Sequence, residues 1–127
     1  MIIETDYLCW FEGGIHMLEH LSSEEKHVLQ ELKKILENRL GSQLIKIALF
    51  GSKARGDFDP DSDLDLAVIV RGLTRELKNE IYNDVGELEL EYLIPLSTFV
   101  ISEEQFDFLK KRERRIALDI ESEGVPL

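Results

Sequence analysis

The sequence predicts a small α/β (α+β) domain, in which a short mixed β-sheet carries helices mainly on one face. Three observations predict this class. Stretches with helical periodicity alternate with strand-like apolar runs along the chain. Residues 65–70 are almost continuously apolar, as in a strand covered on both faces. The 127 residues, 43% hydrophobic and 32% charged, suffice for one core. We expect this domain over residues 22–127, preceded by an aromatic-rich appendage over residues 1–21.

The first half of the domain is expected to form a helix and two strands. Ser22 and Glu25 have the spacing of a capping box, and apolar residues follow them at helical intervals. This pattern predicts a helix from about residue 23 to 40, ended by the glycine that follows. Residues 43–50 and 65–70 are rich in branched and aromatic side chains and predict strands.

The second half is expected to add a helix, a strand and a final helix. Thr74 predicts the N-cap of a helix that runs to about residue 91. Residues 93–101 predict a third strand, and Pro95 indicates that this strand lies at a sheet edge because proline lacks an N–H for the ladder. Ser102, followed by a glutamine three residues later, predicts the cap of the last helix.

Charge and composition narrow the classes of partner. Asp and Glu number 26 against 15 Lys and Arg, for a net charge of −11. Proteins that bind nucleic acid carry basic surfaces, so we expect no direct nucleic-acid binding, and instead a basic protein or a small anion held locally. No apolar run is long enough for a membrane span, and the N-terminus lacks signal-peptide features. The single cysteine, Cys9, fits a reducing compartment. We therefore expect a cytoplasmic protein without membrane contact, and leave homo-oligomerisation open.

The connector between the first two strands contains the candidate site. Gly51-Ser52 directly follows a strand, and its flexible backbone, hydroxyl and N–H groups suit phosphate oxygens, although this dipeptide is common in ordinary turns. Asp63 and Asp65 open the next strand. Residues two apart project from the same face about 6–7 Å apart, so both carboxylates can reach a divalent cation. Two exposed aspartates at a strand end are the simpler alternative. A buried strand favours the metal, because unpaired carboxylates beside a core are costly.

The run GSKARGDFDPDSDLDL, residues 51–66, resembles the signature of minimal nucleotidyltransferases in the DNA polymerase β-like superfamily. The shared features are Gly-Ser, Ala-Arg-Gly and Ser-Asp-x-Asp ahead of a strand. The resemblance implies the polymerase β-like fold, with Asp63 and Asp65 as catalytic residues and ligands of Mg²⁺. It also implies that Gly51 and Ser52 hold the phosphates of a nucleoside triphosphate. Lys53 and Arg55 would add positive charge there, or simply face solvent.

One departure from the family concerns a third carboxylate, which the superfamily commonly supplies from a later strand. The segment LIPLSTFV, residues 93–100, contains no acid. Glu89 and Glu91 precede it, and Glu91 is the nearer candidate for a catalytic role. Both are also explained as solvated residues of a helix.

The resemblance further implies a function. A Mg²⁺-dependent nucleotidyltransferase would transfer a nucleoside monophosphate, AMP from ATP, to a hydroxyl acceptor. Small members of this family often act beside a helical HEPN-type toxin, as antitoxins that adenylylate a tyrosine of the toxin. The alternative is a non-catalytic antitoxin or binding subunit that neutralises its partner by contact.

Two other clusters favour structural roles. His16, His20 and His27 include an i, i+4 pair, but no acidic ligand pattern accompanies them, so a zinc site is disfavoured. The basic stretch from Lys110 to Arg115 could bind an anion, and is better explained as an exposed helix face of an acidic chain.

Overall fold

The computed structural model describes residues 21–51, 63–112 and 114–127. Helices and strands alternate along these ranges as the periodicity predicts. The elements in chain order are α2 (Ser23–Leu40), a 3-10 turn (Gly41–Gln43), β1 (Leu44–Phe50), β2 (Leu64–Val70), α4 (Arg75–Tyr92), β3 (Leu96–Ser102), α5 (Glu103–Lys111), α6 (Arg115–Glu123) and β4 (Val125–Pro126).

The strands form one mixed sheet in the order β3-β2-β1-β4. β1 runs antiparallel to β2 and to β4, whereas β2 and β3 are parallel and are joined through α4. Pro95 immediately precedes β3, and β3 lies at an edge of the sheet, as predicted from that proline.

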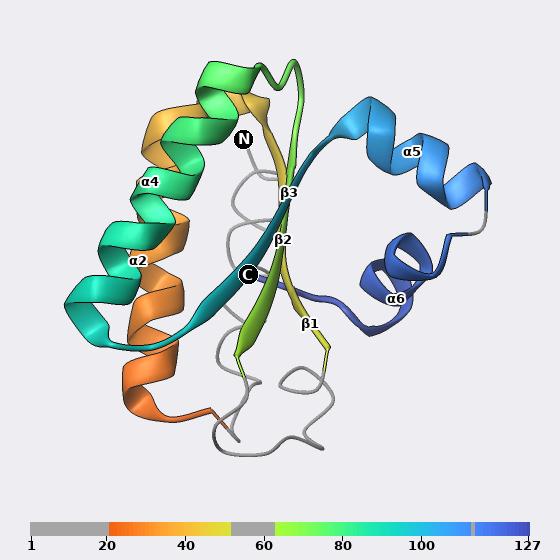
Figure 1. The fold of residues 1–127 in the computed structure, drawn as a ribbon. Coiled ribbons are helices and arrows are strands. Elements are labelled where there is room, and N and C mark those ends of the chain that lie inside the picture. Colours follow the sequence, from red (N-terminus) through yellow and green to blue (C-terminus); the bar gives the residue numbers. More distant parts are fainter. Residues whose placement is uncertain (1–20, 52–62, 113) are drawn as a thin grey trace, which may run out of the picture.

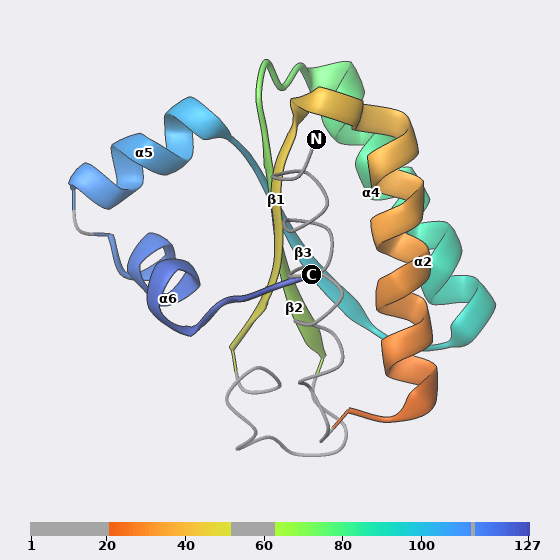
Figure 2. The same cartoon turned by 180° about the vertical axis from the view of Figure 1, so that it is seen from behind.

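Helices cover both faces of the sheet. The two longer helices, α2 and α4, pack on one face, and the shorter α5 and α6 lie on the other (Figures 1 and 2). Alternate residues of β2 serve the two layers: Leu66 and Val68 belong to the core under α2 and α4, whereas Ala67 and Ile69 belong to the core under α5 and α6. Residues 66–70 are all buried, which confirms the predicted two-sided burial of this strand. The α/β class and the mixed sheet are therefore confirmed.

The helix starts follow the capping signals in the sequence. Ser22 and Glu25 form the predicted capping box, with Ser22 N donating to Glu25 Oε1 at 2.9 Å and Glu25 N donating to Ser22 Oγ at 3.1 Å. The side chain of Thr74 accepts from Leu77 N, and that of Ser102 accepts from Gln105 N, each at 3.1 Å. Each cap satisfies a backbone N–H that has no partner within its own helix.

The C-terminal region differs from the predicted single helix. It divides into α5 and α6, and the chain then adds β4, where Ala48 pairs with Pro126 and Leu127 N donates to Ile47 O at 2.9 Å. Ala117 and Ile120 of α6 are buried against the sheet, and this packing requires a change of direction after α5. Within the described ranges, no helix has the length and apolarity to cross a membrane. The appendage predicted over residues 1–21 lies outside the described residues except for Leu21.

Candidate active site

The two halves of the predicted site meet at one end of the sheet. Because β1 and β2 are antiparallel, the last residue of β1, Phe50, pairs with Asp65 near the start of β2. Gly51 follows Phe50, and Asp63 immediately precedes β2. This end of the sheet is the lower one in Figure 1. Antiparallel pairing thus brings together residues that are separated by more than ten positions in the sequence.

Asp65 is on the face of the sheet that carries α5 and α6. It is half-buried and continues the alternation of Ala67 and Ile69, which pack under those two helices. Asp63 is exposed, one step further out on the chain. The backbone between the two aspartates is fixed, because Leu64 N donates to Pro95 O at 3.2 Å. The pair therefore stands at a rigid strand start, with one carboxylate toward the core and one in solvent.

Gly51 packs directly against the carboxylate of Asp65. A Cβ at position 51 would collide with Oδ2 of Asp65 and lie 3.2 Å from its Cγ. Gly51 also has φ +75°, a backbone conformation that side chains disfavour. The sequence indicated a glycine for close approach of a ligand to the backbone. In the structure, the group that already uses this space is the Asp65 carboxylate.

Three of the predicted phosphate-binding residues, Ser52, Lys53 and Arg55, lie outside the described residues. They follow Gly51 directly along the chain. Their roles stay predictions.

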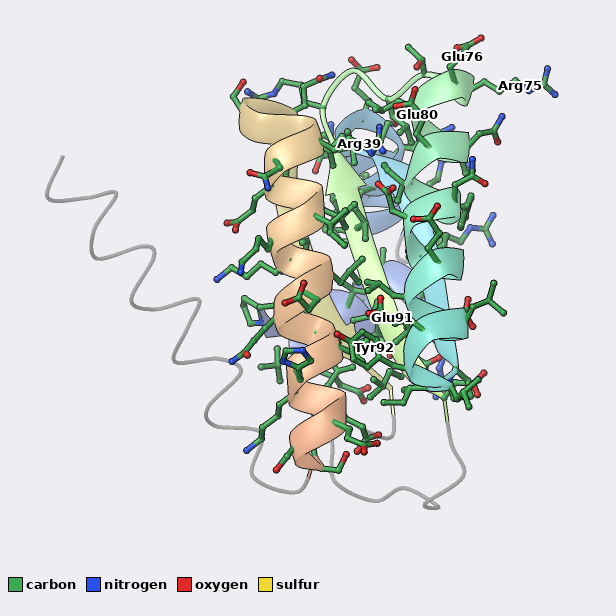
Figure 3. All side chains as sticks on the ribbon, turned by 90° about the vertical axis from the view of Figure 1, so that its left-hand side faces the viewer. Arg39, Arg75, Glu76, Glu80, Glu91 and Tyr92 are labelled. Carbon is green, nitrogen blue, oxygen red and sulfur yellow. The ribbon has the colours of Figure 1, made fainter. Side chains whose placement is uncertain are left out.

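The structure places the third-carboxylate candidates away from Asp65. Glu91 is exposed on α4, in the helical layer on the opposite face of the sheet (Figure 3). Glu89 has a structural contact, since its Oε2 accepts from Leu96 N at 3.2 Å and so fixes the start of β3. Gly51, Asp63 and Asp65 therefore lie together at one end of the sheet, whereas Glu91 lies in the layer of α2 and α4, on the face opposite Asp65.

Ser97 is the residue of β3 that stands beside Asp65 in the parallel ladder. It is exposed and lies on the same face, since Phe99 and Ile101, two and four residues later, belong to the core under α5 and α6. This neighbour could not be predicted from the sequence, because the register between β2 and β3 depends on a crossover through α4. Ser97 thus occupies the place on β3 from which a third carboxylate would reach Asp65.

The donor set fits a magnesium ion that shares its coordination with a substrate. Two carboxylates at one strand start supply hard oxygen ligands, and Mg²⁺ is commonly held by one or two carboxylates together with water and substrate phosphates. Among the described residues there is no group of three or more His, Cys, Asp or Glu able to enclose a metal. Asp63 and Asp65 would therefore hold the ion only in part.

His27, the one histidine in the described ranges, has a different role. Its Nε2 lies 3.1 Å from Tyr92 Oη, and the two rings meet edge to face at a centroid distance of 5.5 Å. Burial, followed by the nearby carboxylates of Glu91 and Glu31, raises the pKa of the Tyr92 phenol. This pair joins α2 to α4.

Comparison with known proteins gives matches over most of the chain. The family model described as "Nucleotidyltransferase domain" matches residues 29–121. Two curated relatives from Methanocaldococcus jannaschii are each named "Putative protein adenylyltransferase", MJ0141 and MJ0604. The first is 34% identical over 74 residues, covering 58% of this chain and 75% of the relative. The second is 30% identical over 74 residues, covering 58% of each.

Solved structures with a related arrangement include a toxin–antitoxin crystallised with AMP-PNP. It has a TM-score of 0.48 and 19% identity, and the alignment covers 83% of this chain and 72% of that one. A nucleotidyltransferase candidate from Sulfolobus solfataricus has a TM-score of 0.43 and 20% identity, over 92% and 84% of the two chains. Both TM-scores are below 0.5, so the family assignment depends on the sequence relatives.

Proposed function

Because the chain belongs to the nucleotidyltransferase domain family and is a nucleotidyltransferase, we propose that it transfers AMP from ATP to a hydroxyl group of a protein partner. The proposal has Asp63 and Asp65 as the catalytic pair and Mg²⁺ as the metal. The observation that carries it is the contact between Gly51 and the Asp65 carboxylate at the end of two paired strands. Position 51 requires glycine, because its φ is positive and because the Asp65 carboxylate fills the space that a side chain would need.

We propose a distinct role for each of the two aspartates at the strand end. Asp65, half-buried and packed on Gly51, has a fixed position, which is what in-line phosphoryl transfer requires of a group that orients a phosphate. Asp63, exposed at the strand start, completes the pair from the solvent side. Bound Mg²⁺ would supply positive charge to the phosphate oxygens.

The proposed reaction balances as a simple substitution at phosphorus. The acceptor oxygen forms a bond to the α-phosphorus of ATP, and the bond from that phosphorus to the oxygen bridging to the β-phosphorus breaks. Pyrophosphate leaves with the bonding electron pair, and the hydroxyl proton passes to a base. Asp63 is exposed, so solvent water at this strand start can receive the proton.

We propose a tyrosine of a HEPN-type toxin as the acceptor, so that the chain acts as an antitoxin. The two curated relatives are named as protein adenylyltransferases, which supports a protein acceptor. The net charge of −11 supports a basic partner and disfavours nucleic acid as the acceptor.

One observation favours a second candidate, an antitoxin that neutralises its partner by contact alone. Beside Asp65 on β3 stands Ser97, where a third carboxylate would complete the site. A site with two carboxylates can retain metal and nucleotide yet transfer slowly.

Label transfer from α-³²P-ATP distinguishes the two candidates. The chain is incubated with Mg²⁺ in the presence and absence of the candidate toxin, and the variant Asp63→Asn/Asp65→Asn serves as the control. We expect label on the partner, reduced at least about 100-fold in the variant, because removal of both carboxylates abolishes the proposed metal ligands. Phosphopeptide mapping then identifies the labelled residue.

Two results would contradict transfer. Label that persists in the double variant would exclude Asp63 and Asp65 as the catalytic pair. A partner that stays unlabelled while it is still bound and silenced would favour neutralisation by contact. Circular dichroism of the variant, with an unchanged Tm, ensures that the loss is not caused by unfolding.

A further inference from the structure

We infer that the outer side of α4 is a docking surface for a partner helix that carries an apolar stripe flanked by lysine or arginine. The surface, called here the α4 stripe, consists of Tyr82, Asn83, Gly86, Leu90 and Leu93. The inference is independent of catalysis, since none of these residues lies at the strand end with Asp63 and Asp65.

The α4 stripe is apolar and unpartnered among the described residues. Leu90 is 79% exposed, Leu93 83% and Tyr82 42%, although all three are large hydrophobic residues. Residues 82, 86 and 90 are four apart within α4, so they line one side of the helix, and Leu93 is the C-cap that follows its last residue. Exposed apolar residues that gather on one side of a helix indicate an interaction site more strongly than scattered ones do.

The α4 stripe also faces away from the rest of the domain. Glu80 and Asp84 turn toward α2, where both bind Arg39, and Figure 3 shows Arg39 and Glu80 facing each other across the two helices. Tyr82 and Gly86 are each two residues further along, and therefore about 200° around the helix. Among the residues that the structure describes, nothing packs over Tyr82 and Leu90 on this side, so a partner can reach it.

Gly86 makes room for that partner. It lies within α4, where glycine destabilises a helix, and a Cβ added there would meet nothing within 4 Å. An open hollow of about 580 Å³ lies here, lined by Tyr82, Asn83, Gly86, Glu87, Glu89 and Leu90. Packing among residues 21–51, 63–112 and 114–127 does not require a glycine here, and its lack of a side chain lets the backbone of a partner approach closely.

Leu93 adds an independent observation. It ends α4 in the left-handed conformation, with φ 56° and ψ 35°, a position that usually holds glycine. Of the described residues other than glycine, it is the one with positive φ. The backbone of Leu93 is strained, and its side chain, at 83% exposed, contributes little packing to the described part of the domain. Its presence is explained if the side chain is used in a complex.

The charges around the α4 stripe determine the chemistry of the occupant. From Asn79 to Tyr92 the helix has no Lys or Arg. Glu87 and Glu89 line the hollow on its two sides. The acidic rim attracts cationic side chains and repels an acidic helix, so the complementary partner has basic residues on both sides of an apolar stripe.

A second copy of this chain fits less well. Its α5–α6 region does combine exposed apolar residues, Phe108, Ile116 and Leu118, with basic ones. However, α4 and α5–α6 lie on opposite faces of the sheet (Figure 2), and two different patches in contact make a head-to-tail interface, which assembles several copies into rings or open chains. A closed complex with a separate partner avoids this.

The α4 stripe leads toward the candidate active site. Leu93 is followed by Ile94 and Pro95, and Pro95 O accepts from Leu64 N, between the two aspartates. The docking surface and the site are therefore joined by a short, hydrogen-bonded turn. A partner held along α4 would be anchored at the end of the sheet where transfer is proposed to occur.

The test uses a synthetic amphipathic peptide of about 18 residues, long enough to form a helix, in which lysines flank a stripe of leucines. Its binding to the full chain is measured by fluorescence anisotropy. The control peptide has glutamates in place of the lysines. We expect the lysine peptide to bind at least about tenfold more tightly than the control, with affinity falling as salt rises.

Matched variants locate the binding. Leu90→Gln is expected to weaken binding about tenfold, because it removes a leucine buried by the partner. Leu118→Gln makes the same change at an exposed leucine of α6 and should leave affinity unchanged. Leu93→Gly should weaken binding while raising Tm, since glycine relieves the positive φ. Asp65→Asn should bind normally, so a failure of the catalytic proposal leaves this one intact.

Three outcomes would overturn the inference. Equal binding of both peptides would exclude recognition by the acidic rim. Equal losses in Leu90→Gln and Leu118→Gln would remove α4 as the location. Self-association in sedimentation velocity that Leu90→Gln abolishes would assign the surface to a second copy of the chain.

Discussion

The two faces of the sheet are built differently. One face carries α2 and α4, each 18 residues long, over a large apolar core. The other carries α5 and α6, each nine residues long, over a core of fewer buried residues. Asp65 belongs to the second face. The layer of α2 and α4, called here the thicker layer, therefore supplies most of the packing among the described residues, and Asp65 lies on the side of the thinner layer of α5 and α6.

This difference means that stability and activity can be changed separately. Gly51, Asp65 and Ser97 lie within two residues of a strand end, and none of them is fully buried. Side chains of α2 are central to the fold and remote from the aspartates. Three substitutions, each paired with a control substitution, test this separation.

The largest effect on stability is expected from Leu32→Ala. Leu32 is fully buried on α2, within the larger core. Removing its isobutyl group loses apolar burial and leaves a cavity, so the free energy of unfolding should fall by about 2–5 kcal/mol. Urea denaturation followed by circular dichroism measures this change.

Leu109→Ala is the matched control on the other face. Leu109 is only partly buried, on α5, and packs against the smaller core. We expect a loss of less than about 2 kcal/mol, because less apolar surface is exposed and no closed cavity remains. Equal losses in the two variants would show that the two layers contribute equally.

The sequence predicts features that depend on neighbouring residues better than features that depend on distant ones. Ser22, Thr74 and Ser102 all cap the helices they were expected to cap, because a cap depends on atoms three residues apart. Recognition of the family from residues 51–66 is confirmed by the family model over residues 29–121. These predictions depend on residues that are close together in the sequence, so a single sequence is enough to make them.

The unpredicted features depend on contacts between distant segments. The break between α5 and α6 has no glycine or proline to mark it, and it follows from the packing of Ala117 and Ile120 on the sheet. β4 is two residues long and exists through its pairing with β1. Ser97 is beside Asp65 only because of the register of β2 and β3. None of these three features can be predicted without knowing how the strands of the sheet pair.

A smaller effect is expected at the polar contact between α2 and α4. Arg39 donates to Asp84 through two nitrogens, with Nε–Oδ2 at 2.5 Å and Nη2–Oδ1 at 3.0 Å, and to Glu80 at 2.8 Å. The hydrogen bond to Asp84 raises the pKa of Arg39, and burial opposes this increase. Asp84 is buried. Asp84→Asn should therefore lower stability by about 1–2 kcal/mol, since it removes the charge from a two-pronged, largely buried hydrogen bond.

Glu80→Gln provides the comparison for Asp84→Asn. The side chain of Glu80 is half exposed, and an exposed ion pair contributes little because water screens it. We expect a loss below about 0.5 kcal/mol by thermal unfolding. A larger loss at Glu80 than at Asp84 would mean that burial does not determine the strength of this contact. Neither variant should change label transfer, because both lie on the face opposite Asp65.

The smallest effect, and one of opposite sign, is expected from Thr98→Val. Thr98 is on β3, between Leu96 and Val100, both of which face the core under α2 and α4. In the described part of the chain, its Oγ1 is a buried side-chain oxygen without a hydrogen-bond partner. Burying an unbonded hydroxyl destabilises a protein, and valine has nearly the same shape and a higher preference for strands. The substitution should therefore stabilise the fold by on the order of 1 kcal/mol.

Differential scanning calorimetry measures the change in Thr98→Val, with Thr98→Ser as the control. Serine keeps the hydroxyl and removes the methyl group, so it should destabilise the protein. If valine destabilises the protein instead, the Thr98 hydroxyl forms a hydrogen bond in the folded protein, and the core under α2 and α4 includes a polar contact. Because Thr98 faces away from Asp65, nucleotide transfer should be unchanged in both variants, which keeps the test of the fold separate from the test of the chemistry.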